Sequence, residues 1–96
     1  MRIGITTHAA DRLRSRLGIQ TQTGVIMDIQ GTFEHSSTYW DHRLKQIVQS
    51  WYCTTSRVVF IVADEPGPNG VRALITVIND GDVVDAVYHA VDQQRH

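Results

Sequence analysis

The sequence predicts a single α+β domain, residues 1–96, in which N-terminal helices pack on a three- to four-stranded antiparallel β-meander. Two observations lead to this fold class. Apolar residues recur at helical spacing in the first half of the chain, whereas the second half carries short β-branched runs separated by turn formers. Helices followed by consecutive strands are the element order of α+β proteins, and a chain of 96 residues supplies one small core.

The first predicted helix covers about residues 7–17. Thr6 or Thr7 can cap it by accepting a hydrogen bond from a backbone amide of the first turn, and Gly18 supplies the left-handed residue that ends it. Its predicted buried stripe consists of apolar residues four apart: Ala9, Leu13 and Leu17.

Two further helices are predicted, over about residues 22–30 and 38–51. The first has apolar residues at helical spacing but is short enough to be a strand, and we interpret it as a helix. The second has Ser37 or Thr38 as its cap and Asp41 near the positive end of its dipole. Its apolar residues recur at intervals of four, seven, eight and eleven: Trp40, Leu44, Ile47, Val48 and Trp51.

Three consecutive strands are predicted in the second half of the chain. The buried, β-branched run at about 58–63 is followed by a turn-rich segment at 64–70 and a second strand at 71–78. A tight turn at 79–82 then leads to a third strand at about 83–90. Burial is expected to come from the helices lying on one face of this sheet.

Charge and composition exclude several classes of protein. Residues 1–60 hold seven Lys or Arg and four Asp or Glu, whereas residues 61–96 hold two and six, so only the first helix offers a basic patch for nucleic acid. No apolar run is long enough to span a membrane and no apolar signal-peptide core follows the N-terminus, so we expect a cytoplasmic protein with no membrane partner. The single cysteine, Cys53, cannot form an internal disulfide and is expected in the core.

A histidine and two arginines lie at four-residue intervals on the first helix: His8, Arg12 and Arg16. This spacing puts them on one face, which is either an active face or the solvated side of an ordinary helix. A third interpretation makes His8 structural, as an anchor between helix and sheet. In the last predicted strand, alternation puts His89 on the same face as Asp85, either as a base with its orienting carboxylate or at a solvated edge.

The segment "THAADRLRSRLGI" resembles the T-x-H-A-x-x-R-x-x-x-R-G-I start of a family of small bacterial and phage domains. That family is similar to ribonuclease toxins of the RelE and barnase types, in which one or two helices precede a curved antiparallel sheet. In this chain an extra leucine, Leu17, precedes Gly18, and the predicted helix at 38–51 departs from the family pattern.

The resemblance implies metal-independent RNA cleavage by a RelE-like endoribonuclease that needs no cofactor. Arg12 and Arg16 would clamp phosphate, because the planar guanidinium donates two parallel charge-assisted bonds. His8 or His89 would exchange protons with the ribose 2′-hydroxyl and the leaving oxygen, and Tyr88 would stack on a base or assist.

The spacing of the histidines does not favour a metal site. His35 and His42 lie seven residues apart with Glu34 and Asp41 beside them, but no His-x3-His pair and no H-E-x-x-H helix is present in the sequence.

The competing hypothesis is a non-enzymatic phage or bacterial interaction protein that binds and inhibits a host protein. Its acidic second half would face a basic partner through four aspartates: Asp80, Asp82, Asp85 and Asp92. Trp40 and Trp51 are expected in the core, whereas Tyr39 and Tyr52 are expected to be free to contact a partner. An exposed edge on the final strand would equally pair two copies into a homodimer.

Overall fold

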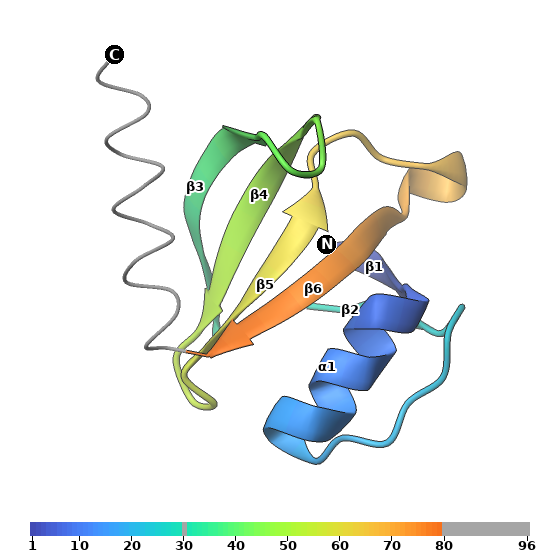
Figure 1. The fold of residues 1–96 in the computed structure, drawn as a ribbon, viewed down its shortest axis with the longest axis vertical. Helices are drawn as coiled ribbons and strands as arrows, with labels where there is room; N and C mark the ends of the chain where they lie inside the picture. The colour runs from blue at the N-terminus through green and yellow to red at the C-terminus, as the bar shows by residue number, and fades with distance from the viewer. Residues whose placement is uncertain (30, 80–96) are drawn as a thin grey trace.

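The computed structural model describes residues 1–29 and 31–79, which form one α-helix and a six-stranded mixed sheet (Figure 1). The strands follow the order β2-β1-β6-β5-β4-β3 across the sheet, with β1 and β6 parallel and every other neighbouring pair antiparallel. The elements are β1 (Arg2–Ile5), α1 (Thr7–Leu17), β2 (Ile26–Asp28), β3 (Phe33–Asp41), β4 (Gln46–Cys53), β5 (Val58–Ala63), the short 3₁₀ turn η1 (Pro68–Gly70) and β6 (Arg72–Asn79).

The predicted fold class is therefore wrong. The described residues contain one helix where three were predicted, and the sheet has six strands of mixed direction in place of a three- to four-stranded antiparallel meander. Two segments predicted as helices form strands. The parallel part of the sheet arises because β1, the first strand of the chain, pairs with β6, the last described one, a long-range contact that local spacing cannot reveal. The predicted strand at 83–90 lies outside the described residues.

The helix α1 covers the span predicted for the first helix, and its N-terminus is tied to the sheet. The Thr6 Oγ1 accepts a hydrogen bond from the Ala9 amide at 3.2 Å and donates one to the Leu74 carbonyl in β6 at 2.6 Å. Gly18 ends the helix in the left-handed region, with φ 68°. The cap therefore fixes both where the helix starts and which strand it packs against.

The predicted helix at 22–30 is a strand. Gly24 adopts φ 89° and donates its amide to the Ile5 carbonyl at 2.8 Å, which turns the chain back along β1. The strand β2 then pairs antiparallel with β1 and leaves Ile26 and Met27 exposed. The short apolar run is thus an edge strand of the sheet, and a strand was the alternative that its length allowed.

The predicted helix at 38–51 is also wrong, because these residues form the antiparallel β3–β4 hairpin. The turn between the strands is closed by Asp41, whose Oδ1 accepts hydrogen bonds from the amides of Arg43 (2.8 Å) and Leu44 (2.9 Å). Lys45 completes the turn with a positive φ of 52°. Asp41 therefore caps a turn, not the start of a helix.

The sheet buries apolar residues on both faces. On the front face, which we define as the face covered by α1, the core contains Ile3, Ile5, Ala9, Leu13, Ile29, Cys53, Val58, Phe60, Val62, Leu74 and Val77. The back face holds a smaller cluster of Val48, Val59 and Ile61, flanked by Tyr39, Tyr52, Ile75 and Ile78. Figure 1 shows α1 lying beside β6, with the β3–β4 hairpin at the other end of the sheet.

Candidate functional site

The basic row on α1 is contiguous. Arg12 Nε donates to His8 Nε2 at 3.4 Å, and His8 is exposed whereas Arg12 and Arg16 are half-buried beside the helix stripe. The row is turned away from the loop that packs on the helix through Thr7 and Thr23, because it begins about 100° around the helix from Thr7. The structure thus joins His8 to Arg12, and the four-residue spacing places Arg16 on the same flank of α1.

Tyr88 and His89, the other two predicted site residues, lie outside the described residues. The other charged residues of α1, Arg14 and Asp11, form an exposed ion pair at 2.8 Å on a different side of the helix from His8. Of the two histidines predicted to exchange protons, His8 or His89, the described residues contain His8.

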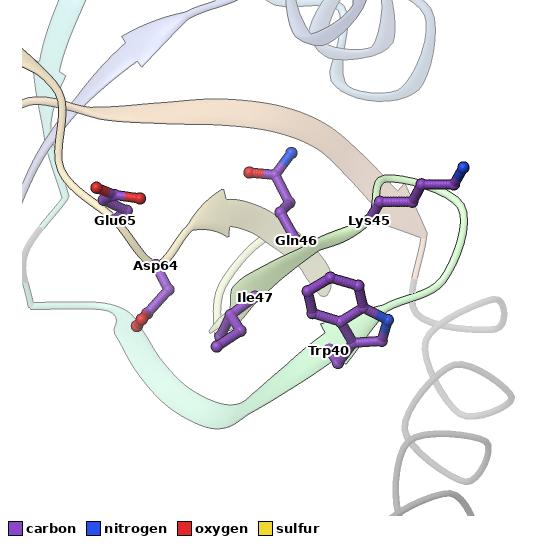
Figure 2. Close-up of a pocket in the computed structure, with 6 residues that line it drawn as sticks. All are labelled: Trp40, Lys45, Gln46, Ile47, Asp64 and Glu65. Atoms are coloured by element: carbon purple, nitrogen blue, oxygen red, sulfur yellow. The ribbon is translucent and has the colours of Figure 1, made fainter.

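An exposed apolar surface lies on the β3–β4 hairpin, far from α1 in the sheet, and the described residues expose further large apolar side chains elsewhere: Ile19, Val25, Ile26 and Met27. Three large apolar side chains are exposed on the hairpin: Trp40 at 49%, Ile47 at 47% and Leu44 at 38%. We call these three residues, with Asp64 and Glu65 beside them, the hairpin surface. Trp40, Ile47 and the two carboxylates line a depression of about 330 Å³, together with Lys45 and Gln46 (Figure 2).

Three neighbouring strands present Trp40, Ile47 and Asp64 as one row. Trp40 of β3 pairs with Ile47 of β4, and the Asp64 amide, just beyond β5, donates to the Ile47 carbonyl at 3.1 Å. Adjacent strands are about 4.8 Å apart, so the row spans about 10 Å from indole to carboxylate at the backbone. One end of the row is therefore aromatic, its middle aliphatic and its far end anionic.

A chain of hydrogen bonds fixes the Asp64 carboxylate. Its Oδ1 accepts from Gln49 Nε2 at 2.8 Å, and the Gln49 Oε1 in turn accepts from the Trp51 indole N–H at 2.9 Å. The Trp51 ring packs on His35, with ring centroids 5.1 Å apart. Because Trp51 orients Gln49 and Gln49 donates to Asp64 Oδ1, the carboxylate is held in place before any ligand arrives.

The expectations for the aromatic residues are reversed on two points. Trp40 is exposed, not in the core, and Tyr39 and Tyr52 pack beside the buried back-face cluster. Trp51 is half-buried and packs against the front core, as expected. Strand alternation explains the change, because Trp40 and Tyr39 must point to opposite faces of the sheet.

No family model, curated protein or solved structure matches this chain. What the hairpin surface and the basic row can do therefore follows from their own chemistry.

The described residues offer no metal centre and no membrane span. Within residues 1–29 and 31–79, no group of three or more His, Cys, Asp or Glu side chains is placed to hold a metal ion. His35 Nε2 is instead hydrogen-bonded to Thr38 Oγ1 at 3.0 Å. Among the same residues, no helix has the length and apolar character needed to cross a bilayer.

Cys53 is a buried thiol at the end of β4, in the front core. Burial raises its pKa, but hydrogen bonds from Thr55 and Ser56 outweigh that effect and lower the pKa to about 7. Cys53 Sγ lies 3.4 Å from Thr55 Oγ1, and this turn joins β4 to β5. The thiol is thus part of the structure of the turn.

Sequence reasoning missed Gln49, Asp64 and Glu65 as site residues. No local signal points to Asp64 and Glu65, whereas the alternation of Ile47, Gln49 and Trp51 is a local signal that would have placed Gln49 on one strand face. The helical interpretation of this segment scattered the same residues around a cylinder.

Proposed function

We propose that this protein is an interaction module that binds another protein through the hairpin surface. The observation that carries the proposal is the exposure of Trp40 and its cross-strand partner Ile47, with Leu44 also exposed in the turn between the two strands. Contiguous exposed apolar side chains on a small protein are typical of a binding site, and tryptophan is among the most frequent anchors of interfaces. Binding and inhibition of a host protein is the activity we assign to this surface.

The shape and surroundings of the surface support the same function. The hairpin lies at an edge of the described sheet, so a partner can reach Trp40 and Ile47 without displacing α1. Asp64 and Glu65 add polar groups at the margin of the apolar patch, which is the usual arrangement of an interface core and its rim.

The test compares two substitutions of exposed apolar residues at opposite edges of the sheet. A partner captured by the tagged protein is identified by mass spectrometry, purified, and titrated calorimetrically against wild type, Trp40→Ser and Ile26→Ser. We expect Trp40→Ser to raise the Kd about tenfold or more, as an interface anchor does, and Ile26→Ser to leave it unchanged. Equal affinity of all three proteins overturns the proposal.

Ribonuclease activity is the second candidate, and the contact between Arg12 and His8 favours it. A guanidinium and an imidazole on one exposed helix flank are suited to a phosphate group and a proton transfer. This activity would be the metal-independent, RelE-like cleavage that the N-terminal motif implies.

The assay incubates RNA with the protein at low salt, with and without EDTA. Cleavage by wild type that survives EDTA and is lost in folded His8→Ala and Arg12→Ala would support the nuclease. Arg14→Ala is the matched control, because this arginine is exposed on the same helix and is paired with Asp11. Intact RNA with wild type rejects the nuclease.

A further inference from the structure

The hairpin surface has a chemical polarity that specifies what its partner presents. Ile47 lies between Trp40 and Asp64 in the row across three strands, and Glu65 follows Asp64 in the chain. Figure 2 shows the indole on one side of Ile47 and the two carboxylates on the other. The depression therefore offers apolar contact and negative charge within the reach of one long side chain.

The two carboxylates are available to a ligand. Of the Asp64 oxygens, Oδ1 accepts from Gln49, whereas Oδ2 has no hydrogen-bond partner among residues 1–29 and 31–79. Glu65 is exposed and forms no ion pair with any described residue. The site thus carries up to two formal negative charges, one of them held in position by the relay from Trp51 and Gln49.

Among residues 1–29 and 31–79, neither neighbouring cation forms an ion pair with these carboxylates. Arg72 Nε is engaged by the backbone carbonyl of Asp64 at 3.0 Å, and the described residues contain no ion pair between Arg72 and either acid. Lys45 belongs to the β3–β4 turn, at the Trp40 end of the depression, and points away from Asp64 and Glu65 in Figure 2. Its charge gives the site a direction, because a second cation is repelled from the Trp40 end and attracted to the Asp64 end.

A long cationic side chain matches this arrangement. Lysine and arginine carry an apolar stem with a charged end, and their stems pack on apolar surface while the charge stays at a polar boundary. Arginine fits better than lysine, because its planar guanidinium donates two parallel hydrogen bonds to carboxylate oxygens. The free Glu65 carboxylate and Asp64 Oδ2 are the acceptors that such a fork requires.

We infer that the hairpin surface binds an arginine side chain of the partner protein, with its stem on Ile47 and Trp40 and its guanidinium on Asp64 and Glu65. This inference rests on the proposed function and adds the chemistry of the partner. It also assigns Gln49 and Trp51 as positioning residues, because they hold the Asp64 carboxylate and do not themselves meet the ligand.

The direct test uses a single arginine as the probe. The Trp40 indole N–H resonance is followed by NMR while Nα-acetyl-arginine methylamide is added, with the citrulline and lysine analogues as comparisons. We expect a saturable shift with arginine and an apparent Kd about tenfold higher for citrulline, which keeps the shape but loses the charge. An equal response to citrulline or to lysine overturns the assignment of arginine.

Isosteric variants identify the groups that bind the probe. Asp64→Asn retains an oxygen for Gln49 but removes the charge, so the double variant Asp64→Asn/Glu65→Gln is expected to abolish saturation. Glu34→Gln is the control, because Glu34 is an exposed carboxylate elsewhere on the same hairpin. An unchanged response in the double variant contradicts the inference.

The purified partner separates this inference from the proposed function. Loss of affinity with Trp40→Ser but not with Asp64→Asn/Glu65→Gln would reject arginine as the ligand and support the interaction module. Unchanged affinity with Trp40→Ser would remove the interaction module itself. Loss of affinity with both variants supports both claims.

Discussion

The region of the sheet under α1 and the β3–β4 hairpin differ in how much of their apolar surface is buried. Under α1, apolar residues of β1, β6 and the helix are almost fully enclosed, with Ile3 and Leu74 at 0% and Leu13 at 2% exposure. On the β3–β4 hairpin, Trp40 and Ile47 remain about half exposed on a strand pair of the same sheet. The difference indicates that the residues under α1 form a scaffold, and it supports the hairpin as the binding surface that we propose.

The size of the helix explains the difference. An α-helix is about 10 Å across, whereas six strands spaced about 4.8 Å apart make a sheet about 24 Å wide. One helix anchored at β6 through Thr6 therefore leaves the β3 end of the sheet uncovered by any helix of the described residues. Trp51 and its relay occupy the border between the two regions.

The largest expected effect is the loss of stability when the scaffold is truncated. Leu13→Ala is expected to lower the free energy of unfolding by about 3 kcal/mol, because it leaves a cavity between α1 and the sheet. Ile47→Ala on the hairpin is expected to cost less than about 1 kcal/mol, since half of that side chain is already in water. Chemical denaturation measures both, and equal losses would contradict the division of the molecule.

The next effect is a pH dependence at the border of the scaffold. The pKa of Cys53 is lowered from 9.0 to about 7, so the folded protein binds fewer protons than the unfolded chain between these values. Stability should therefore rise by about 2 kcal/mol from pH 7 to pH 9 and be lost again as the pH falls through 7.

Cys53→Ala tests this pH dependence, because the variant should have a flat profile over the same range. The scan ends below pH 10, because burial and the charge of Asp41 raise the pKa of Tyr39 above 10.0 and ionisation of tyrosine opposes folding at higher pH. A profile of the variant as steep as that of wild type assigns the slope to another group.

A smaller loss is expected at the cap that ties α1 to β6. Thr6→Ala removes the acceptor for the Ala9 amide and the donor to the Leu74 carbonyl, and should cost about 1 kcal/mol. Thr7→Ala is the control, because Thr7 is exposed and its hydroxyl is bonded to the Thr23 hydroxyl, not to the sheet, within the described part of the chain. Thermal unfolding of the pair should show the larger drop for Thr6→Ala, and the reverse order would remove the assigned role of the cap.

The smallest effect on stability is expected at the hairpin surface. Trp40→Ser should change the free energy of unfolding by less than about 1 kcal/mol while reducing partner affinity, because a half-exposed side chain contributes more to an interface than to the fold. Denaturation and calorimetry on the same preparation measure the two effects, and a large loss of stability would assign Trp40 to the fold.

Short-range sequence signals correctly located α1 and β5, because short-range interactions determine where these elements begin and end. Thr6, Gly18 and the stripe of Ala9 and Leu13 place α1, because caps and helical spacing act within a few residues. The β-branched run at 58–63 likewise coincides with β5. Neither signal depends on the rest of the chain.

The helix predicted over 38–51 failed for a physical reason. Apolar intervals of four, seven, eight and eleven satisfy a helical period, but Ile47 and Trp51 also lie an even number of residues apart, as strand alternation requires. The aromatic and β-branched residues flanking the Asp41 turn favour strands. Pairing with β5 decides the outcome, and that contact is not local.

The candidate site was invisible for the same reason. Trp40, Ile47 and Asp64 come from three segments that only the register of β3, β4 and β5 brings together. The basic row on α1, whose residues share one helix, was visible from spacing alone.

Hydrogen exchange on the complex with the purified partner tests the central claim most directly. The account predicts slower amide exchange over residues 39–48 and 63–66 on binding, with no change over α1. Protection over residues 7–17 without protection of the hairpin would contradict it and assign the interaction to the row of His8, Arg12 and Arg16.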